Sequence, residues 1–164
     1  MVPIIAFAGR HDAGKTTLLT KIIAELNKQG IGVGVIKNAH HKLEIPNAKD
    51  SERLFNAGAL MAHTFGEDMQ ITYTRLKNKS LNDVIKEMQA NVDIIILEGH
   101  KESEYPKVEV MRREIDEKLL PITNVIARVL DFDLEVEPKI ELFGFEEIDK
   151  ITNFIIKFIE DYEK

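Results

Sequence analysis

The chain lacks several features that would assign it to a particular class of protein. None of its 164 residues is cysteine, so it forms neither disulfide bonds nor thiolate metal sites, and we expect a cytoplasmic protein. The aliphatic run Ile94–Leu97 is far too short to span a bilayer. Strand-like sequence begins at Val2 with no basic leader or cleavage site, so we expect a protein that is neither secreted nor embedded in a membrane.

Positively charged residues are also fewer than negatively charged ones. The chain carries 22 Lys and Arg residues against 28 Asp and Glu residues, for a formal net charge of −6. An acidic protein is repelled overall by a phosphate backbone, so we expect no nonspecific nucleic-acid binding and no binding to anionic membranes. Internal repeats, low-complexity tracts and linkers are absent as well. Residues 1–164 are therefore expected to form a single domain with a buried core.

The segment Gly9–Thr17 carries the most specific motif in the chain. Gly9 to Thr16 match the G-x-x-x-x-G-K-T pattern of a phosphate-binding loop. A strand-like apolar run precedes the segment, and a stretch with apolar residues at helical spacing follows it. In such a loop, backbone N–H groups at a helix N-terminus face phosphate oxygens, Lys15 adds positive charge and Thr16 binds magnesium. We therefore expect a nucleotide to contact Gly9, His11, Asp12, Ala13, Gly14, Lys15, Thr16 and Thr17.

Two further strand-like segments end in polar residues. Segment 31–36 is rich in β-branched residues, and segment 94–97 has the continuous aliphatic character of a strand that is buried on both faces. Ligands gather at the carboxyl ends of parallel strands. We expect Glu98, at the end of the second segment, to orient magnesium directly or through water. The residues expected to contact the nucleotide from these two strand ends are Lys37, His40, His41, Gly99 and Lys101.

Asp50 has two interpretations. It stands at the expected start of a helix that Gly58 ends, where Asp50 or Ser51 can act as the N-cap. Alternatively, its carboxylate binds magnesium or positions water close to the phosphates. On the second interpretation, the candidate metal ligands are Thr16, Asp50 and Glu98, and the candidate catalytic residues are Lys15, Asp50, Glu98 and Arg10.

The remaining pattern predicts an α/β protein with the P-loop NTPase fold: a mostly parallel central sheet flanked by helices in three layers. Two strands are expected at 61–65 and 69–74, joined by a turn, and others at 106–112, 125–130 and 140–143. Segment 106–112 alternates like a partly solvated strand and is a candidate edge for dimer pairing. Helices are expected around 81–88 and at the C-terminus, where an apolar stripe runs from Ile148 to Tyr162. The acidic loop 131–137 lacks the N-K-x-D guanine signature of Ras-like GTPases.

Four of these stretches, in this order, resemble the MobB family of molybdopterin-guanine dinucleotide biosynthesis adaptor proteins over nearly the whole chain. They are Gly9–Thr17, Ile36–His41, Lys49–Ser51 with Ala57–Ala59, and Leu97–Lys101 followed by Pro106 and Lys107. The chain departs from the family pattern at Ala48, where glycine is usual, and at His100, where an aromatic residue such as phenylalanine is usual.

The resemblance implies a protein, usually a homodimer, that binds GTP with magnesium and hydrolyses it slowly. It also implies assistance to a partner nucleotidyltransferase, MobA, which joins GMP from GTP to molybdopterin to form a molybdenum cofactor. Arg10 suggests a further hypothesis. A related class of dimeric P-loop ATPases carries a lysine at this position that reaches the partner's phosphates, so Arg10 is a candidate for stabilising transition-state charge across a dimer. The alternative is a solvated loop arginine.

Two other functions remain as alternatives to this hypothesis. A metallochaperone-type GTPase would use His40 and His41 as metal ligands, although adjacent side chains without a clear third ligand make a poor metal site. A small-molecule kinase would transfer the γ-phosphate to an acceptor hydroxyl. Such a kinase normally needs a lid, and the short segments between the expected elements leave little room for one.

Overall fold

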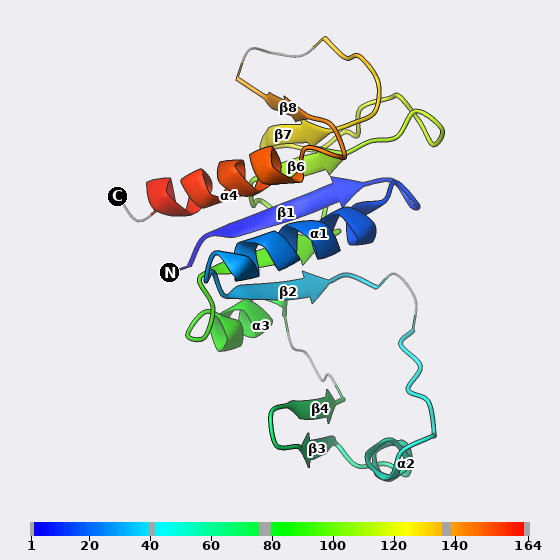
Figure 1. Ribbon diagram of the computed structural model, residues 1–164. Helices are drawn as coiled ribbons and strands as arrows, with labels where there is room; N and C mark the ends of the chain where they lie inside the picture. Colours follow the sequence, from blue (N-terminus) through cyan, green and yellow to red (C-terminus); the bar gives the residue numbers. More distant parts are fainter. Residues whose placement is uncertain (1, 40–41, 76–79, 136–138, 163–164) are drawn as a thin grey trace. The chain divides into compact units, whose positions relative to one another are not determined.

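The computed structural model describes residues 2–39, 42–75, 80–135 and 139–162 (Figure 1). The chain divides into two compact units. Unit 1 comprises Met1–Asn38 and Ile85–Lys164, and unit 2 comprises Ala39–Val84. Among the described residues, no helix combines the length and the hydrophobicity that crossing a membrane requires.

Unit 1 is built on a six-stranded sheet whose paired strands are all parallel. The strand order is β2-β5-β1-β6-β7-β8, so β1 lies between β5 and β6. In register, Glu98 of β5 lies opposite both Phe7 of β1 and Lys37 of β2, which brings the carboxyl ends of these three strands to one edge of the sheet. The strands are β1 (Ile4–Gly9), β2 (Val33–Lys37), β5 (Ile94–Glu98), β6 (Lys107–Val110), β7 (Val125–Val129) and β8 (Glu141–Phe143).

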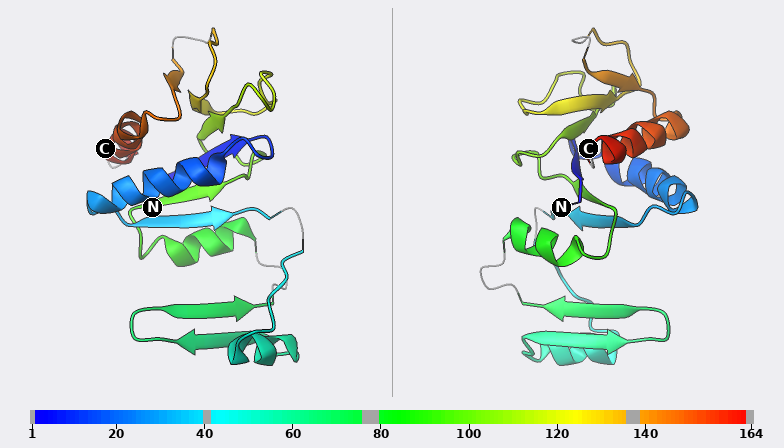
Figure 2. Two further views of the ribbon diagram at one scale, coloured as in Figure 1. Left: turned by 45° about the vertical axis from the view of Figure 1, so that its right-hand side comes forward. Right: turned by 90° about the vertical axis from the view of Figure 1, so that its left-hand side faces the viewer.

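Helices cover both faces of this sheet. Helices α1 (Lys15–Lys28) and α4 (Ile148–Tyr162) lie together on one face, and α3 (Leu81–Met88) lies on the other (Figure 2). At the end of α3, Met88 packs so closely on β2 that a Cβ added to Gly34 would lie 2.7 Å from its Cε. The result is the three-layer arrangement of helices around a parallel sheet that the sequence predicts.

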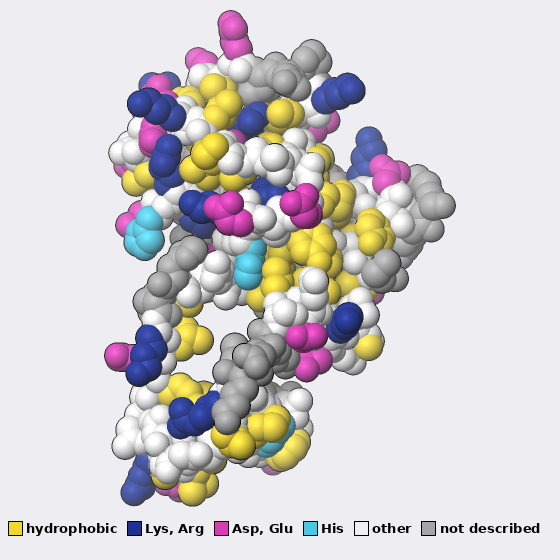
Figure 3. Space-filling model, turned by 180° about the vertical axis from the view of Figure 1, so that it is seen from behind, with side chains coloured by type: hydrophobic (Ala, Val, Ile, Leu, Met, Phe, Trp, Pro, Cys, Tyr) yellow, Lys and Arg dark blue, Asp and Glu magenta, His cyan; other side chains and the backbone are white. Residues whose placement is uncertain are grey.

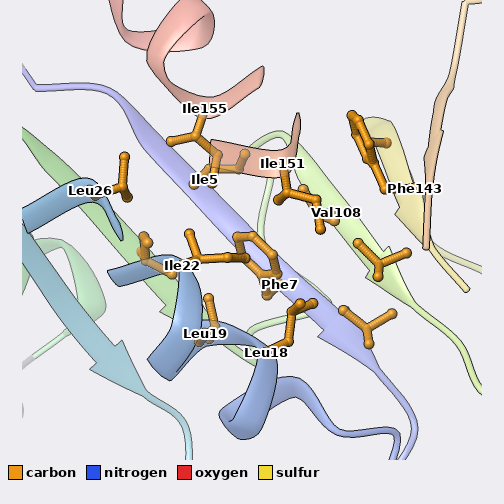
Figure 4. Close-up of a cluster of buried hydrophobic side chains, with 14 of the residues drawn as sticks. Ile5, Phe7, Leu18, Leu19, Ile22, Leu26, Val108, Phe143, Ile151 and Ile155 are labelled. Carbon is orange, nitrogen blue, oxygen red and sulfur yellow. The ribbon is translucent and has the colours of Figure 1, made fainter. Parts of the chain in front are cut away.

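The core lies between β1 and the two helices on its face. Figure 4 shows side chains of β1, α1 and α4 meeting there with neighbours from β6 and β8. Burying each large aliphatic or aromatic side chain contributes about 1.5–3 kcal/mol to stability. The labelled residues are Ile5, Phe7, Leu18, Leu19, Ile22, Leu26, Val108, Phe143, Ile151 and Ile155. The predicted apolar stripe of α4 does not extend to Tyr162, which is 48% exposed at the end of that helix.

Strand β6 differs from its prediction as a partly solvated edge strand. It lies between β1 and β7, and all four of its residues are buried. Lys107 Nζ donates hydrogen bonds to the carbonyl oxygens of Ser103 and Tyr105 at 2.5 and 2.9 Å. Glu109 accepts from Arg128 Nε at 2.9 Å. The alternation of polar and apolar residues therefore reflects charges that have partners inside the protein, because a buried charge is tolerated only when it is paired.

Unit 2 combines one short helix, α2 (Asp50–Asn56), with an antiparallel hairpin of β3 (Met61–Phe65) and β4 (Gln70–Thr74). The hairpin confirms the prediction of two strands joined by a turn. Phe55 anchors the helix: its ring lies 5.7 Å from that of Tyr73, and the Arg75 guanidinium lies 4.4 Å from its centre.

The start of α2 is capped differently from the expectation. Lys49, rather than Asp50 or Ser51, occupies the N-cap position. The Glu52 carboxylate reaches back to accept hydrogen bonds from the backbone N–H groups of Ala48 and Lys49, at 2.9 and 3.0 Å. Glu52 thus satisfies the backbone donors at and just before the N-cap, as the third helical residue of a capping box does.

Candidate functional site

The phosphate loop connects β1 to α1 in a shape that its glycines make possible. A Cβ added at Gly9 would lie 2.4 Å from the carbonyl oxygen of Val110, so only glycine fits between the loop and β6. Gly14 is the N-cap of α1 and has a φ of 85°, a left-handed conformation that favours glycine. The first turn of α1 leaves backbone N–H groups without helical partners, and these are the donors that an anion binds.

Lys15 folds back over this loop. Its Nζ donates hydrogen bonds to the carbonyl oxygens of Gly9 and Arg10, at 3.1 and 2.7 Å. Burial lowers the pKa of Lys15, although the nearby charge of Glu98 partly offsets that effect. The ammonium group is thus held inside the loop, where a phosphate oxygen can replace the two carbonyls as its partner.

Beside the loop, three side chains from different elements meet. Thr16 Oγ1, in the first turn of α1, donates to Glu98 Oε1 at 2.7 Å. Lys37 Nζ, at the end of β2, donates to the same carboxylate oxygen at 2.8 Å and to Thr16 Oγ1 at 3.2 Å. The sheet register places Lys37 directly beside Glu98, so the contact follows from the parallel pairing of β2 with β5.

Glu98 is nearly buried, at 8% exposure. Burial alone raises the pKa of this carboxyl, but hydrogen bonds from Lys37 and Thr16, together with the charges of Lys37 and Lys15, more than reverse it and leave the pKa below its usual value. Glu98 is therefore ionised at neutral pH. A carboxylate and a hydroxyl oxygen at the edge of a phosphate loop are hard ligands of the kind that magnesium prefers.

These two oxygens suit a metal that also keeps water and phosphate ligands. Within the part of the chain that the structure describes, no cluster of three or more His, Asp or Glu residues forms a complete metal cage. Magnesium is usually bound by one or two protein oxygens together with waters and substrate phosphates. Thr16 and Glu98 therefore fit magnesium bound with a nucleotide.

The other residues predicted to contact the nucleotide differ in location and exposure. His11 Nδ1 lies 2.8 Å from Asp12 Oδ2, and both side chains are exposed, at 95% and 77%. Gly99 has a φ of 89° and donates its backbone N–H to Phe7 at 3.0 Å, next to Glu98. Lys101 is exposed in the turn that follows. Ala13 is buried, and Thr17 is exposed in α1.

For three further predicted residues, the described structure does not test a place at this site. His40 and His41 lie outside the described residues. Asp50 belongs to unit 2, where its carboxylate is 93% exposed and pairs with Arg53 at 3.3 Å. Nucleotide contact by the two histidines and metal binding by Asp50 stay predictions.

The loop also has an acidic partner that sequence reasoning missed. Arg10 Nη2 lies 2.7 Å from Asp116 Oδ2. Asp116 comes from the irregular segment after β6, where no periodic pattern marks it, so only the fold reveals the contact. The action of Arg10 across a dimer stays a prediction, and it now requires Arg10 to leave Asp116.

A second residue that sequence reasoning missed, Arg112, also lies beside the loop. Its guanidinium stacks 3.9 Å from the centre of the Phe145 ring. A Cβ added at Gly14 would lie 3.3 Å from Arg112 Nε and 3.7 Å from the Phe145 ring. The stack therefore packs directly against the phosphate loop.

Next to this stack, at the carboxyl ends of β7 and β8, is an open pocket of about 590 Å³. Its walls combine apolar side chains with the carboxylates of Asp133 and Glu135, and Phe145 continues the chain from the pocket toward the loop. The lining residues are Leu130, Phe132, Asp133, Leu134, Glu135, Leu142, Phe143 and Gly144. The pocket and the Thr16–Glu98 pair lie on opposite sides of β1 in the strand order.

Solved structures share this fold. A MobB protein homologue from Bacillus stearothermophilus superposes with a TM-score of 0.75 at 22% identity, covering 96% of this chain and 98% of that one. MobB of Bacillus subtilis gives a TM-score of 0.77 at 24% identity, covering 94% and 96%. These likenesses confirm the predicted three-layer α/β fold of the P-loop NTPase type.

Sequence comparisons identify the family. The molybdopterin-guanine dinucleotide biosynthesis adapter protein of Escherichia coli is 30% identical over 98% of this chain and 95% of its own length. Its Haemophilus influenzae counterpart is 29% identical over 98% and 92%. The family model for molybdopterin guanine dinucleotide synthesis protein B matches residues 4–131. These matches confirm the resemblance found in the sequence, and the chain belongs to the MobB family.

Proposed function

We propose that this protein is an adapter in molybdopterin-guanine dinucleotide biosynthesis and that unit 1 binds GTP together with magnesium. The adapter role is supported by the relatives that carry this description along nearly their whole length. The nucleotide part rests on one observation: the hydroxyl of Thr16 and the carboxylate of Glu98 meet at 2.7 Å beside a complete phosphate loop.

Each part of this site has its own task in binding the triphosphate. The N–H groups of the first turn of α1 receive phosphate oxygens, and Lys15 exchanges the carbonyls of Gly9 and Arg10 for phosphate. Thr16 and Glu98 hold magnesium, directly or through water. Bound magnesium neutralises charge on the phosphates.

The pocket at the ends of β7 and β8 supports guanine as the base. Strands β1 and β7 are two places apart in the sheet, about 10 Å at a spacing of about 4.8 Å per strand. Apolar walls suit the faces of a purine ring. The carboxylates of Asp133 and Glu135 accept hydrogen bonds only, as the ring N–H and 2-amino donors of guanine require. Adenine lacks both of these donors on that edge.

The proposal extends to slow hydrolysis of GTP, to a homodimer, and to a MobA-type nucleotidyltransferase that acts on molybdopterin in the cytoplasm. Unit 2 supports a role in protein contacts, because a two-stranded hairpin is marginally stable alone and exposed apolar patches mark interaction sites. Figure 3 shows hydrophobic side chains in yellow at the molecular surface. Among the described residues of unit 2, the exposed large hydrophobic ones are Leu43, Leu54, Leu60, Met61, Phe65 and Met69.

Binding of a fluorescent GTP analogue to paired lysine variants tests the proposed nucleotide site. Lys15→Ala removes the ammonium group inside the loop and is expected to weaken binding by at least about tenfold. Lys21→Ala is the matched control, since Lys21 belongs to the same helix and its exposed ammonium pairs with Glu146 at 3.6 Å. Equal affinity in wild type and the Lys15 variant would refute phosphate binding at this loop.

A further inference from the structure

We propose that Lys37 is a tethered cation that occupies the magnesium position while the site is empty of metal, and that magnesium binds by displacing it. The inference rests on the proposed magnesium site. Lys37 Nζ lies 2.8 Å from Glu98 Oε1 and 3.2 Å from Thr16 Oγ1, the two oxygens assigned to the metal.

The three groups form a closed triangle, because Thr16 Oγ1 is itself 2.7 Å from Glu98 Oε1. The hydroxyl donates its hydrogen to the carboxylate and accepts one from the ammonium group, so Lys37 uses the oxygen lone pairs that a metal would need. An ammonium group and a magnesium ion repel each other strongly at such short range. Both cannot occupy this position at once.

The geometry of β2 makes the contact specific to Lys37. The residue is the last of its strand, and its backbone is in register with Glu98 of β5. Lys15, the other lysine that acts on Glu98 electrostatically, has its Nζ bonded to loop carbonyls instead. Lys37 is thus the described lysine whose ammonium group contacts both oxygens proposed to bind the metal.

Lys37 also supplies the partner that a buried carboxylate needs. The Glu98 side chain is only 10% exposed, whereas that of Lys37 is 57% exposed. A buried carboxylate without a partner is strongly destabilising, so Lys37 keeps Glu98 ionised and ready for metal. Because the Lys37 stem is largely in solvent, the ammonium can leave without unpacking the core. Once displaced, it is available to a phosphate oxygen, which links metal binding to nucleotide binding.

Titration of the nucleotide-free protein with Mn²⁺, followed by electron paramagnetic resonance, tests this directly. Lys37→Met keeps the stem and removes the cation, and should bind Mn²⁺ about fivefold or more tightly than wild type. Lys37→Arg retains a competing cation and should stay close to wild type. Lys21→Met, which removes a lysine elsewhere on unit 1, should also leave the affinity unchanged. Unchanged or weaker binding by the Lys37→Met variant would overturn the inference.

Repeating the Mn²⁺ titration at high salt distinguishes direct occupancy of the metal position by Lys37 from a general charge effect. At about 0.5 M salt, charges more than about 4 Å apart are largely screened. If the Lys37→Met variant still binds Mn²⁺ more tightly than wild type at this salt concentration, direct competition is supported. If the difference in affinity disappears, direct competition is refuted.

The Glu98→Gln variant distinguishes failure of this inference from failure of the proposed metal site. If that variant binds Mn²⁺ as well as wild type, the proposed metal site itself fails. If it loses Mn²⁺ while Lys37→Met gains nothing, only the displacement inference fails.

A second measurement uses the wild-type protein and therefore does not depend on whether a variant folds. In ¹⁵N NMR of lysine ammonium groups, a hydrogen-bonded Lys37 should give a slowly exchanging signal before metal is added. Addition of Mg²⁺ should remove that signal by releasing the ammonium to solvent. A Lys37 signal that survives metal saturation unchanged would contradict displacement.

Discussion

Glu98 accepts a hydrogen bond from Thr16 at 2.7 Å although the two residues are 82 positions apart in the chain. The parallel sheet creates this contact, because β5 ends beside β1 at the point where the phosphate loop begins. A generic anion-binding loop thereby becomes half of the site proposed for a metal-bound nucleotide.

Glu98→Gln should separate metal-dependent from metal-independent nucleotide binding. The amide keeps the shape of the side chain but loses the charge that attracts magnesium. We expect the variant to bind GTP with the same affinity whether magnesium or a chelator is present, as measured by calorimetry. Glu25→Gln, a change at the other end of α1, is the control and should keep the magnesium dependence of wild type.

Gly9→Ala should abolish nucleotide binding and lower stability. The new methyl group would lie 2.4 Å from the Val110 carbonyl oxygen, and relieving that overlap costs about 1–3 kcal/mol and shifts the loop. Urea unfolding and GTP titration measure the two effects. Gly30→Ala offers a contrast: Gly30 has a φ of 79° but nothing within 4 Å of an added Cβ, so a loss of about 1 kcal/mol with normal GTP binding is expected.

The sequence predicts those parts of the site that lie within one short segment, and it does not predict contacts between distant segments. The phosphate loop and the strand that ends at Glu98 are local patterns, and both were predicted. The contacts of Arg10 with Asp116 and of Arg112 with Phe145 join segments far apart in sequence. No spacing rule reveals such pairs, so these contacts came only from the fold.

The errors have a physical basis as well. Alternating polar and apolar residues in β6 indicated solvent on one face, but a pattern of one strand cannot distinguish water from a buried partner such as Arg128. At α2, the sequence offered Asp50 and Ser51 as caps, but Lys49 occupies the N-cap position, and Glu52 accepts the backbone N–H groups of Ala48 and Lys49 from within the helix. In both places a charged side chain found a protein partner that local pattern does not show.

Removing one member of the buried Glu109–Arg128 pair should be strongly destabilising. Their side chains are 1% and 8% exposed and lie 2.9 Å apart, and Glu109 also accepts the backbone N–H of Leu120 at 2.7 Å. Glu109→Ala leaves a buried guanidinium uncompensated, at a cost of about 3–5 kcal/mol. Urea unfolding checks this value. The double variant Glu109→Leu with Arg128→Met should recover much of the loss, and additive losses would contradict pairing as the cause.

Acid should loosen the start of α2 through Glu52. A hydrogen bond from the Lys49 backbone is the main cause of a lowered pKa for this carboxyl, and bonds from Ala48 and Tyr73 lower the pKa further against an opposing effect of burial. Its stabilisation is therefore full above the ordinary glutamate pKa of about 4.3 and is lost as pH falls through the lowered folded value. Hydrogen exchange at the α2 amides should accelerate, relative to unstructured peptide, below about pH 4. Glu52→Gln should abolish this pH dependence; an identical profile in that variant would contradict the assignment.

The two pocket carboxylates should determine the preference for guanine. Asp133→Asn and Glu135→Gln each replace a pure acceptor with a group that also donates. We expect the double variant to lose about tenfold or more in GTP affinity and little in ATP affinity, because a hydrogen bond to a charged group is worth about 1.5–3 kcal/mol and one to a neutral group about 0.5–1.5 kcal/mol. Competition binding measures both nucleotides. Glu141→Gln, on β8 outside the pocket lining, is the control, and equal effects on GTP and ATP would show that the pocket does not read the base.

Above all, we propose that this MobB-family chain binds GTP as a magnesium complex. Calorimetric titration of the wild-type protein with GTP and with ATP, each with magnesium and with a chelator, tests it most directly. We expect GTP to bind more tightly than ATP and magnesium to strengthen the binding of GTP. Equal affinity for the two nucleotides, or GTP binding that ignores magnesium, would contradict it.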